Sequence, residues 1–223
     1  GKKARISPSS FPILGKPIVE RVMEMLVHNG VRDLILVVSP DDRDISRYFR
    51  RESQIDADIR FVYQPERKGM ANALSCAAPL LSESFVLSAC DNLVARSDIA
   101  RLIQFMRSDQ EPNGVLTLLP VEPDRLGSVG IVEMDGPWIT RIVEKPKPEE
   151  APSDISSLPL YVFSPKILDY LPEVPLSPRG EYELQDAIQM LIERHGRVGG
   201  VLVNRRLTLT NAADLLALNR EYL

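Results

Sequence analysis

The chain has little of the chemistry that disulfide frameworks, metal–sulfur centres and membrane spans require. Its 223 residues include only two cysteines, two histidines and one tryptophan. Cys76 and Cys90 both lie in apolar sequence, which is typical of reduced core residues. No apolar run approaches the ~20 residues that a membrane-spanning helix needs, and no segment resembles a signal peptide. The sequence therefore predicts a cytoplasmic protein with no membrane partner.

The chain also lacks an excess of positive charge. The formal net charge is -4, and the basic residues are interspersed with acidic ones. Nucleic acid is therefore not an expected partner, and any anionic ligand must be met by a few local cations. With 44% hydrophobic residues and no flexible linker, the sequence favours a single globular domain over residues 1–223.

What the chain does have is an alternation of short apolar strands and amphipathic helices. Such a pattern is typical of an α/β protein with a sheet between two layers of helices. Apolar residues at helical spacing and flanking proline or glycine predict the helices. Helices are expected at 17–29, 42–51, 70–81, 99–106, 184–194 and 211–222. Strands are expected at 34–38, 60–63, 85–92, 115–120, 160–163, 198–203 and 206–209, with a hairpin of 130–133 and 139–143. The proline-rich segments 145–152 and 171–178 are expected to be loops.

Residues 85–92 (FVLSACDN) form an apolar run that ends in a carboxylate. A run without alternation is typical of a strand covered on both faces. Asp91 would then lie at the carboxyl end of that strand, where ligands bind in open α/β sheets and where it could hold a divalent metal against phosphate. The alternative is an aspartate that only stabilises a turn.

Seven segments, in chain order, resemble motifs of the sugar-phosphate nucleotidyltransferases, the family that includes glucose-1-phosphate thymidylyltransferase. The first is residues 1–8 (GKKARISP), similar to a G-x-G-T-R-[LM]-x-P loop, and the second is 11–18 (FPILGKPI), similar to L-P-V-x-G-K-P-I. The others are Gln64 with 69–73 (GMANA), Asp91-Asn92, 130–133 (GIVE), 143–146 (VEKP) and 180–186 (GEYELQD). Together they span nearly the whole chain.

The resemblance implies a three-layer αβα sandwich with a Rossmann-like, mainly parallel mixed sheet. It also implies transfer of a nucleotidyl group from a nucleoside triphosphate to a sugar 1-phosphate, with release of pyrophosphate. Such chemistry depends mainly on positioning and on neutralising charge. Mg²⁺ is the implied cofactor, and a homo-oligomer is compatible with the sequence.

The resemblance also implies roles for individual residues. Arg5, Asp91 and Lys145 would be catalytic, with Asp91 as the metal ligand, Arg5 clamping the triphosphate and Lys145 meeting the sugar phosphate. On the nucleotide side the implied contacts are Gly1, Gln64 and Gly69. On the sugar side they are Gly130, Glu144 and Lys145.

Departures from the family pattern cluster on the triphosphate side. Lys3 and Ala4 replace a glycine and a threonine of the opening loop, and Met70 replaces the threonine of G-T-A. Thr208 takes the place of a second metal-binding aspartate. Removing one preorganised charged contact typically costs on the order of a hundredfold in rate.

These departures leave two functions open. One is a nucleotidyltransferase with a modified metal site. The other is a catalytically silent relative that binds a nucleotide or nucleotide sugar in a regulatory or scaffolding role. A glycosyltransferase is disfavoured because a D-x-D motif would need a carboxylate where Leu93 stands. No hexapeptide repeat is present, so a C-terminal β-helix is not expected.

The family resemblance raises one further expectation about the sheet. Family members carry an apolar central strand immediately before the opening loop. Without it, two neighbouring strands would have unpaired backbone groups. We therefore expect such a strand to precede Gly1.

Overall fold

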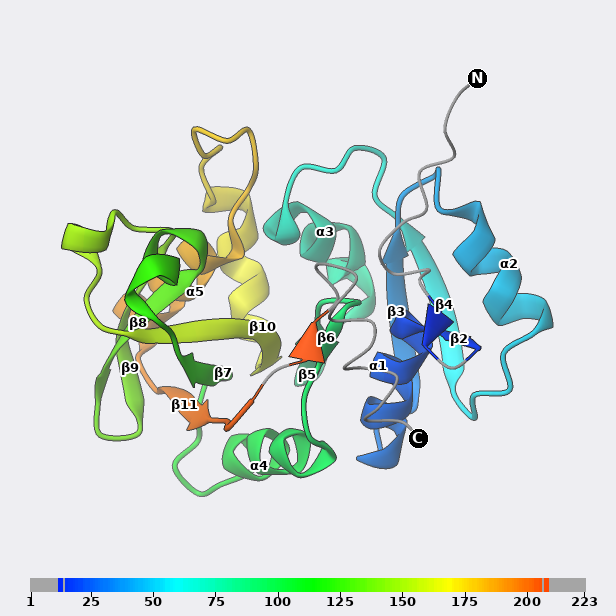
Figure 1. Ribbon diagram of the computed structural model, residues 1–223, viewed down its shortest axis with the longest axis horizontal. Helices are drawn as coiled ribbons and strands as arrows, with labels where there is room; N and C mark the ends of the chain where they lie inside the picture. Colours follow the sequence, from blue (N-terminus) through cyan, green and yellow to red (C-terminus); the bar gives the residue numbers. More distant parts are fainter. Residues whose placement is uncertain (1–11, 14, 206, 209–223) are drawn as a thin grey trace.

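The computed structural model describes residues 12–13, 15–205 and 207–208. Along this part of the chain, strands and helices alternate as the sequence predicts (Figure 1). The α-helices are α1 (Ile18–His28), α2 (Arg43–Arg51), α3 (Met70–Ala77), α4 (Arg96–Met106) and α5 (Leu184–His195). The helix expected at 211–222 lies outside the described residues.

Every strand predicted within the described residues is present, but the short strands at 12–13 and 16–17 were not predicted. The strand predicted at 85–92 ends at Ser88, and the strand predicted at 160–163 begins earlier, at Ile155. The strands are β1 (Pro12–Ile13), β2 (Lys16–Pro17), β3 (Asp33–Val38), β4 (Asp58–Tyr63), β5 (Phe85–Ser88), β6 (Asn92–Leu93), β7 (Gly114–Pro120), β8 (Gly130–Asp135), β9 (Trp138–Glu144), β10 (Ile155–Phe163), β11 (Val198–Leu202) and β12 (Leu207–Thr208). Six of them form the main sheet, in the order β5-β10-β7-β11-β9-β8. A separate parallel pair, β3–β4, lies on the flank opposite the β8–β9 hairpin (Figure 1).

The sheet is mixed, as predicted. The ladders β7–β11 and β3–β4 are parallel, whereas β10 runs antiparallel to both β5 and β7. Among the described strand pairs, more are antiparallel than a mainly parallel sheet would contain. The reason is that β10 inserts between β5 and β7, which makes those two strands parallel to each other without being neighbours.

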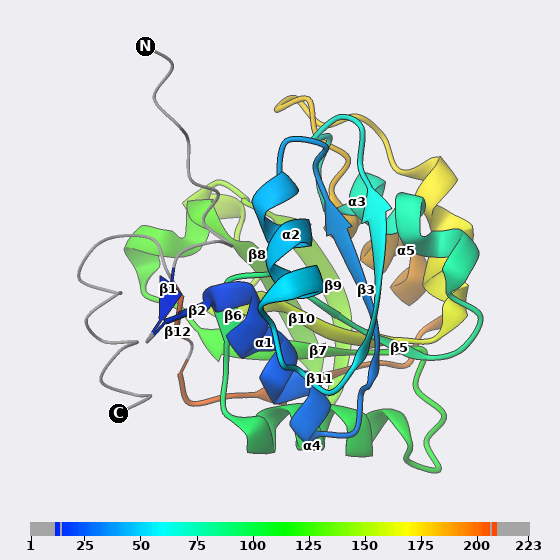
Figure 2. The same ribbon diagram turned by 90° about the vertical axis from the view of Figure 1, so that its right-hand side faces the viewer.

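Alternating side chains on the central strands place a hydrophobic core on each side of the sheet. Leu160 and Val162 of β10 pack in a cluster with α1, α4 and β3, whereas Tyr161 and Phe163 pack in a second cluster with α3 and α5. Burial on both faces explains why these strands read as continuous apolar runs. The arrangement confirms the predicted layers of helix, sheet and helix, and Figure 2 shows α1 and α2 in front of the main sheet.

Helix ends follow the local sequence. Pro17 precedes α1, where its missing N–H costs no hydrogen bond, and Gly196 with φ 61° follows α5. α3 is shorter than the predicted 70–81, because a 3-10 turn over Ala78–Leu80 that contains Pro79 follows it. The expected loops at 145–152 and 171–178 also contain 3-10 turns, at Pro148–Glu150 and within Pro165–Glu173.

Both cysteines are free, as expected, although each is half-buried and neither is fully in the core. Among the described residues, no helix is long and apolar enough to cross a membrane.

Candidate functional site

Asp91 lies just beyond the carboxyl end of β5. The strand ends at Ser88, and residues 90–91 form a turn before β6 begins at Asn92. The amide of Asn92 donates to the carbonyl of Ala89 at 3.4 Å. The predicted position is therefore confirmed, and the side chain of Asp91 is half-buried at that edge.

A second segment reaches the same edge from the far end of the chain. β12 pairs antiparallel with β6, so Leu207 lies opposite Leu93 and Thr208 lies opposite Asn92. The backbone of Thr208 is thus paired with the residue next to Asp91. Thr208 is the residue that the resemblance aligns with a second metal-binding aspartate.

Gln64 and Gly69 meet at the end of β4. The side-chain amide of Gln64 donates to the carbonyl of Gly69 at 3.2 Å and to Oδ1 of Asn72 at 2.9 Å. Gly69 has φ 94°, a left-handed conformation that favours glycine. Its α-carbon also faces the backbone of Tyr182, since an added Cβ would lie 2.6 Å from the Tyr182 carbonyl oxygen. A side chain at position 69 would therefore push the two loops apart.

Backbone hydrogen bonds fasten this loop to the segment after β10. The Tyr182 amide donates to the Lys68 carbonyl at 2.8 Å, and the Ala71 amide donates to the Tyr182 carbonyl at 3.1 Å. Two of the segments that carry the family resemblance are thereby joined, although more than 100 residues separate them in the chain. Tyr182 therefore fixes the position of the loop that carries Gly69.

The β8–β9 hairpin brings Gly130 opposite Glu144. An added Cβ on Gly130 would lie 3.1 Å from Oε2 of Glu144, 3.0 Å from Oγ of Ser157 and 3.4 Å from Cγ of Gln185. Oε2 of Glu144 is buried and has no hydrogen-bond partner. An acceptor in that state costs free energy unless a ligand supplies a donor. The space in front of Gly130 thus contains a buried hydrogen-bond acceptor without a protein partner.

Two cations flank Glu144. Nζ of Lys145 lies 3.6 Å from Oε1 of Glu144, and Nη2 of Arg179 lies 3.4 Å from the same oxygen. Arg179 also pairs with Oε1 of Glu183 at 2.6 Å, and Ser177 donates to that oxygen at 2.8 Å. Lys145 adopts φ 45°, which is unusual for a residue with a side chain and typical of functional sites. The cluster therefore combines buried carboxylates with two partly exposed cations.

Burial controls the acid–base state of this cluster. Desolvation raises the pKa of Glu144 above its usual value, although the cations of Lys145 and Arg179 act in the opposite direction. Desolvation, with a contribution from the charge of Glu183, also raises the pKa of Asp186. Both carboxyl groups therefore hold their protons more tightly than the same groups in water.

The structure brings the predicted residues together in two groups. Gly130, Glu144 and Lys145 form one group, and Gln64 with Gly69 forms the other, linked to the first through the 177–183 loop. Asp91 lies at the end of β5, separate from the described contacts of both groups. Gly1 and Arg5 lie outside the described residues, as do Lys3 and Ala4.

Lys16, the basic residue nearest to the opening loop among those described, is already engaged. Its Nζ lies 2.5 Å from Oε1 of Glu24 and 3.6 Å from Oε1 of the buried Glu20. The hydrogen bond to Glu24 raises the pKa of Lys16. We therefore assign Lys16 to anchoring the start of α1.

Asp91 fits a magnesium ion that arrives with phosphate ligands. Mg²⁺ is usually held by one or two carboxylates, substrate phosphates and water. Among the described residues no group of three or more histidine, cysteine, aspartate or glutamate side chains gathers as a metal site. A single carboxylate at the strand end matches a metal that depends on its substrate for the remaining ligands.

Sequence reasoning missed Arg179 and Ser157. Arg179 directly precedes the 180–186 segment, and this position could have suggested a role in the site. Arginine is common on protein surfaces, however, and the sequence does not reveal its ion pair with Glu144. Ser157 comes from β10, which crosses the sheet beside β8. Only the three-dimensional register brings its hydroxyl to Gly130.

The fold and the site define the class of this protein. It is an α/β sandwich whose polar groups gather at one end of its strands. A family model described as nucleotidyl transferase matches residues 4–206. The uridylyltransferase AglF of Haloferax volcanii is 33% identical, over 88% of this chain and 82% of its own length. The UTP–glucose-1-phosphate uridylyltransferase of Haemophilus influenzae is 29% identical, over 85% of this chain and 76% of its own.

Solved structures agree on the fold. A UDP-glucose pyrophosphorylase crystallised with UDP-glucose superposes with a TM-score of 0.85 at 19% identity, covering 97% of this chain and 90% of the other. A second pyrophosphorylase, from Acinetobacter baumannii, gives a TM-score of 0.83. The chain belongs to the nucleotidyl transferase family, and the predicted membership of the sugar-phosphate nucleotidyltransferases is confirmed.

Proposed function

We propose that this protein couples UTP to glucose 1-phosphate, forming a nucleotide sugar and pyrophosphate. Nucleotidyl transfer to a sugar 1-phosphate is the reaction of the family. The choice of UTP and glucose 1-phosphate follows the names of the relatives from Haloferax volcanii and Haemophilus influenzae. One observation supports binding of the sugar at this site. It is the buried Oε2 of Glu144, which lies in front of Gly130 and has no hydrogen-bond partner.

Each residue has a role that its surroundings support. Glu144 accepts hydrogen bonds from sugar hydroxyls, and Gly130 leaves space for the ring. Lys145 neutralises the sugar phosphate, which attacks the α-phosphorus of the triphosphate. Arg179, which the sequence did not indicate, holds Glu144 and Glu183 in place.

On the nucleotide side, Gln64 and Gly69 contact the base, and Gly1 and Arg5 contact the triphosphate. Mg²⁺ held by Asp91 would supply charge neutralisation between the phosphates. These residue roles are consistent with a cytoplasmic enzyme that needs no nucleic acid and no membrane.

The test is a pyrophosphate-release assay with Mg²⁺ over a panel of nucleoside triphosphates and sugar 1-phosphates. The expected result is turnover that is fastest with UTP and glucose 1-phosphate. Asp91→Asn should lower kcat by on the order of a hundredfold or more, because it removes a charged contact to the reacting phosphates. Asp109→Asn, at an exposed aspartate in the loop after α4, is the matched control. Equal rates for both variants would refute the role of Asp91.

The second candidate function is binding of a nucleotide or nucleotide sugar without turnover. It is favoured by Thr208, a neutral residue that the resemblance aligns with the second metal-binding aspartate and whose backbone pairs with Asn92, the residue after Asp91. A silent relative would show no pyrophosphate release, yet a nucleotide would raise its melting temperature by linkage. Turnover above background by the unmodified protein would remove this candidate.

A further inference from the structure

The outer edge of the β3–β4 pair is open. Among the described residues, β4 pairs with β3 alone, and Figure 2, which turns this flank toward the reader, shows β4 beside α2. The amides of Asp58 and Gln64 both donate to carbonyl groups on the β3 side, each at 2.9 Å. Because backbone groups alternate in direction along a strand, the groups that point away from β3 are those of Ile59, Phe61 and Tyr63.

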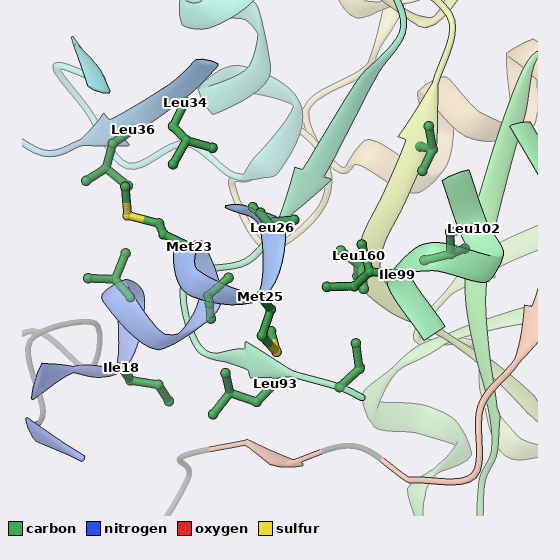
Figure 3. Packing of buried hydrophobic residues seen from close by; sticks show 14 of the residues in the cluster. Ile18, Met23, Met25, Leu26, Leu34, Leu36, Leu93, Ile99, Leu102 and Leu160 are labelled. Atoms are coloured by element: carbon green, nitrogen blue, oxygen red, sulfur yellow. The ribbon is translucent and has the colours of Figure 1, made fainter. Parts of the chain in front are cut away.

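The apolar layer on one face of this pair is closed over β3 and open over β4. Leu36 of β3 is only 7% exposed, and Figure 3 shows the side chain of Met23 of α1 beside it. Its partner in β4, Phe61, is half-buried, as is Ile59 on the same face. Tyr63, the last residue on that face, is 50% exposed. A helix therefore covers the apolar side chains of β3, whereas those of β4 are accessible.

A groove of about 490 Å³ runs between β4 and α2. Phe49 and Arg50 of α2 line one side, and the lining on the other side includes Ile59, Phe61 and Tyr63 of β4. The same three residues of β4 thus present side chains to the groove and backbone groups to the open edge. An extended chain that paired with this edge would place every second side chain over the groove.

Arginines surround the end of the groove near Tyr63. A second cavity of about 340 Å³, which shares Arg50 and Tyr63 with the groove, is also lined by Arg47 and Arg51. Among the described residues, neither Arg50 nor Arg51 forms an ion pair, and Arg47 pairs only with the exposed Asp44, at 3.6 Å. Since the whole chain has a net charge of -4, this is a local concentration of positive charge, and it favours an acidic partner.

A second copy of this chain fits the edge less well. Arg50 lies over the middle of β4, with its guanidinium carbon 5.8 Å from the centroid of the Phe61 ring. Two copies paired antiparallel about Phe61 would align the outward-pointing backbone groups of both strands, but they would also bring the two Arg50 side chains together. Like charges in that position oppose association, whereas the carboxylates of a different chain would neutralise them.

We propose that β4 takes up an extended, acidic segment of a partner protein as an additional strand. The backbone of the segment pairs with the outward-pointing groups of β4, and its apolar side chains fill the groove beside α2. Its carboxylates meet Arg47, Arg50 and Arg51. Main-chain hydrogen bonds supply affinity in such strand addition, and the side-chain contacts supply specificity. The surface lies on the flank opposite the β8–β9 hairpin (Figure 1), apart from the candidate sugar site.

The affinity test uses the whole protein and two synthetic peptides, ETVTVTE and KTVTVTK. In a strand, each peptide presents its two valines and both of its charged ends on one face, so either orientation brings a charge to the arginines. We expect the glutamate peptide to bind at least ~10-fold more tightly than the lysine peptide, and Arg50→Glu to weaken its binding by about tenfold. Arg141→Glu, at an exposed arginine of β9, is the matched control and should leave binding unchanged.

Hydrogen exchange in the complex with the glutamate peptide tests strand addition itself. Exchange of the amides of Ile59, Phe61 and Tyr63 should slow at least ~5-fold, because these amides gain partners. Exchange of the Asp58 amide, which already donates toward β3, should not change. Absence of binding by the glutamate peptide, equal binding of both peptides, or equal protection of all amides along β4 would overturn the proposal.

Two other occupants are distinguished in the same experiment. Protection of the alternate β4 amides by self-association, without peptide, would assign the edge to a second copy and overturn the proposal. Sedimentation of the protein with phosphatidylglycerol vesicles, reduced by Arg50→Glu and accompanied by no peptide binding, would assign the arginines to a lipid surface and also overturn it. None of these readouts depends on catalysis, so the test is independent of the proposed reaction.

Discussion

Glu144→Gln is the variant that most sharply separates sugar recognition from nucleotide recognition. The change keeps the size of the side chain and removes the charge of a buried acceptor whose Oε2 has no partner. A hydrogen bond to a charged group contributes about 1.5–3 kcal/mol, and each 1.4 kcal/mol corresponds to about a tenfold change in affinity. We therefore expect KM for the sugar 1-phosphate to rise roughly 10- to 150-fold. KM for the nucleoside triphosphate should stay the same.

Stability provides a check on the same side chain. Because burial raises the pKa of Glu144 in the folded state, the folded protein binds the proton more tightly than the unfolded chain. This contribution to stability is complete below the unfolded pKa and is lost as pH rises through the folded pKa. The free energy of unfolding of the wild type should therefore fall more steeply above about pH 4.5 than that of Glu144→Gln.

The assay is steady-state kinetics with each substrate varied in turn, together with urea unfolding across the same pH range. Glu133→Gln, on the exposed face of the same hairpin, is the matched control and should change neither KM nor the pH dependence. If Glu144→Gln raised both KM values equally, or left both unchanged, the assignment of Glu144 to the sugar would be wrong.

Further changes test the sugar pocket and the packing of the sheet. Gly130→Ala places a methyl group about 3.0 Å from Oγ of Ser157, and we expect KM for the sugar 1-phosphate to rise tenfold or more with little change in nucleotide affinity. An unchanged KM would show that the sugar does not approach this glycine. Gly199→Ala places its Cβ 2.5 Å from the Phe105 ring and should lower the free energy of unfolding by about 1–3 kcal/mol through overpacking. Gly127→Ala, whose nearest contact is 3.5 Å away, is the control in urea unfolding, and equal effects would contradict the packing argument.

Much of the fold could be predicted because each element carries its own local signal. The helical spacing of Ile18, Val22 and Met25 predicts α1, and the apolar run before Asp91 predicts β5. Strand direction has no such signal. A fully buried strand such as β10 is apolar on both faces, so its sequence does not reveal that it lies antiparallel between β5 and β7.

The candidate site was predictable where short motifs mark it and not where distant segments meet. Gly130 and Glu144 belong to recognisable segments, and a hairpin turn places them opposite each other. The backbone hydrogen bond from Tyr182 to Lys68 depends on how α3 packs against the chain after β10. Likewise, Arg179 acquires a role only because the fold places it beside Glu144.

The change Thr208→Asp examines the metal side of the account. The β6–β12 register pairs this position with Asn92, the residue that follows Asp91. If a second carboxylate improves metal binding, kcat should rise by up to roughly a hundredfold. Thr140→Asp, on the exposed face of β9, is the control for adding a carboxylate elsewhere. A rate that is unchanged or lower would show that the present single-carboxylate arrangement is already matched to the substrate.

The central claim is nucleotidyl transfer, and the most direct measurement is the amount of both products formed from UTP and glucose 1-phosphate with Mg²⁺. The account predicts that nucleotide sugar, identified by mass, accumulates in step with pyrophosphate and in equal amount. It also predicts that neither product forms when glucose 1-phosphate is omitted. Pyrophosphate without nucleotide sugar, or binding of the nucleotide with neither product from any pair in the substrate panel, would contradict it.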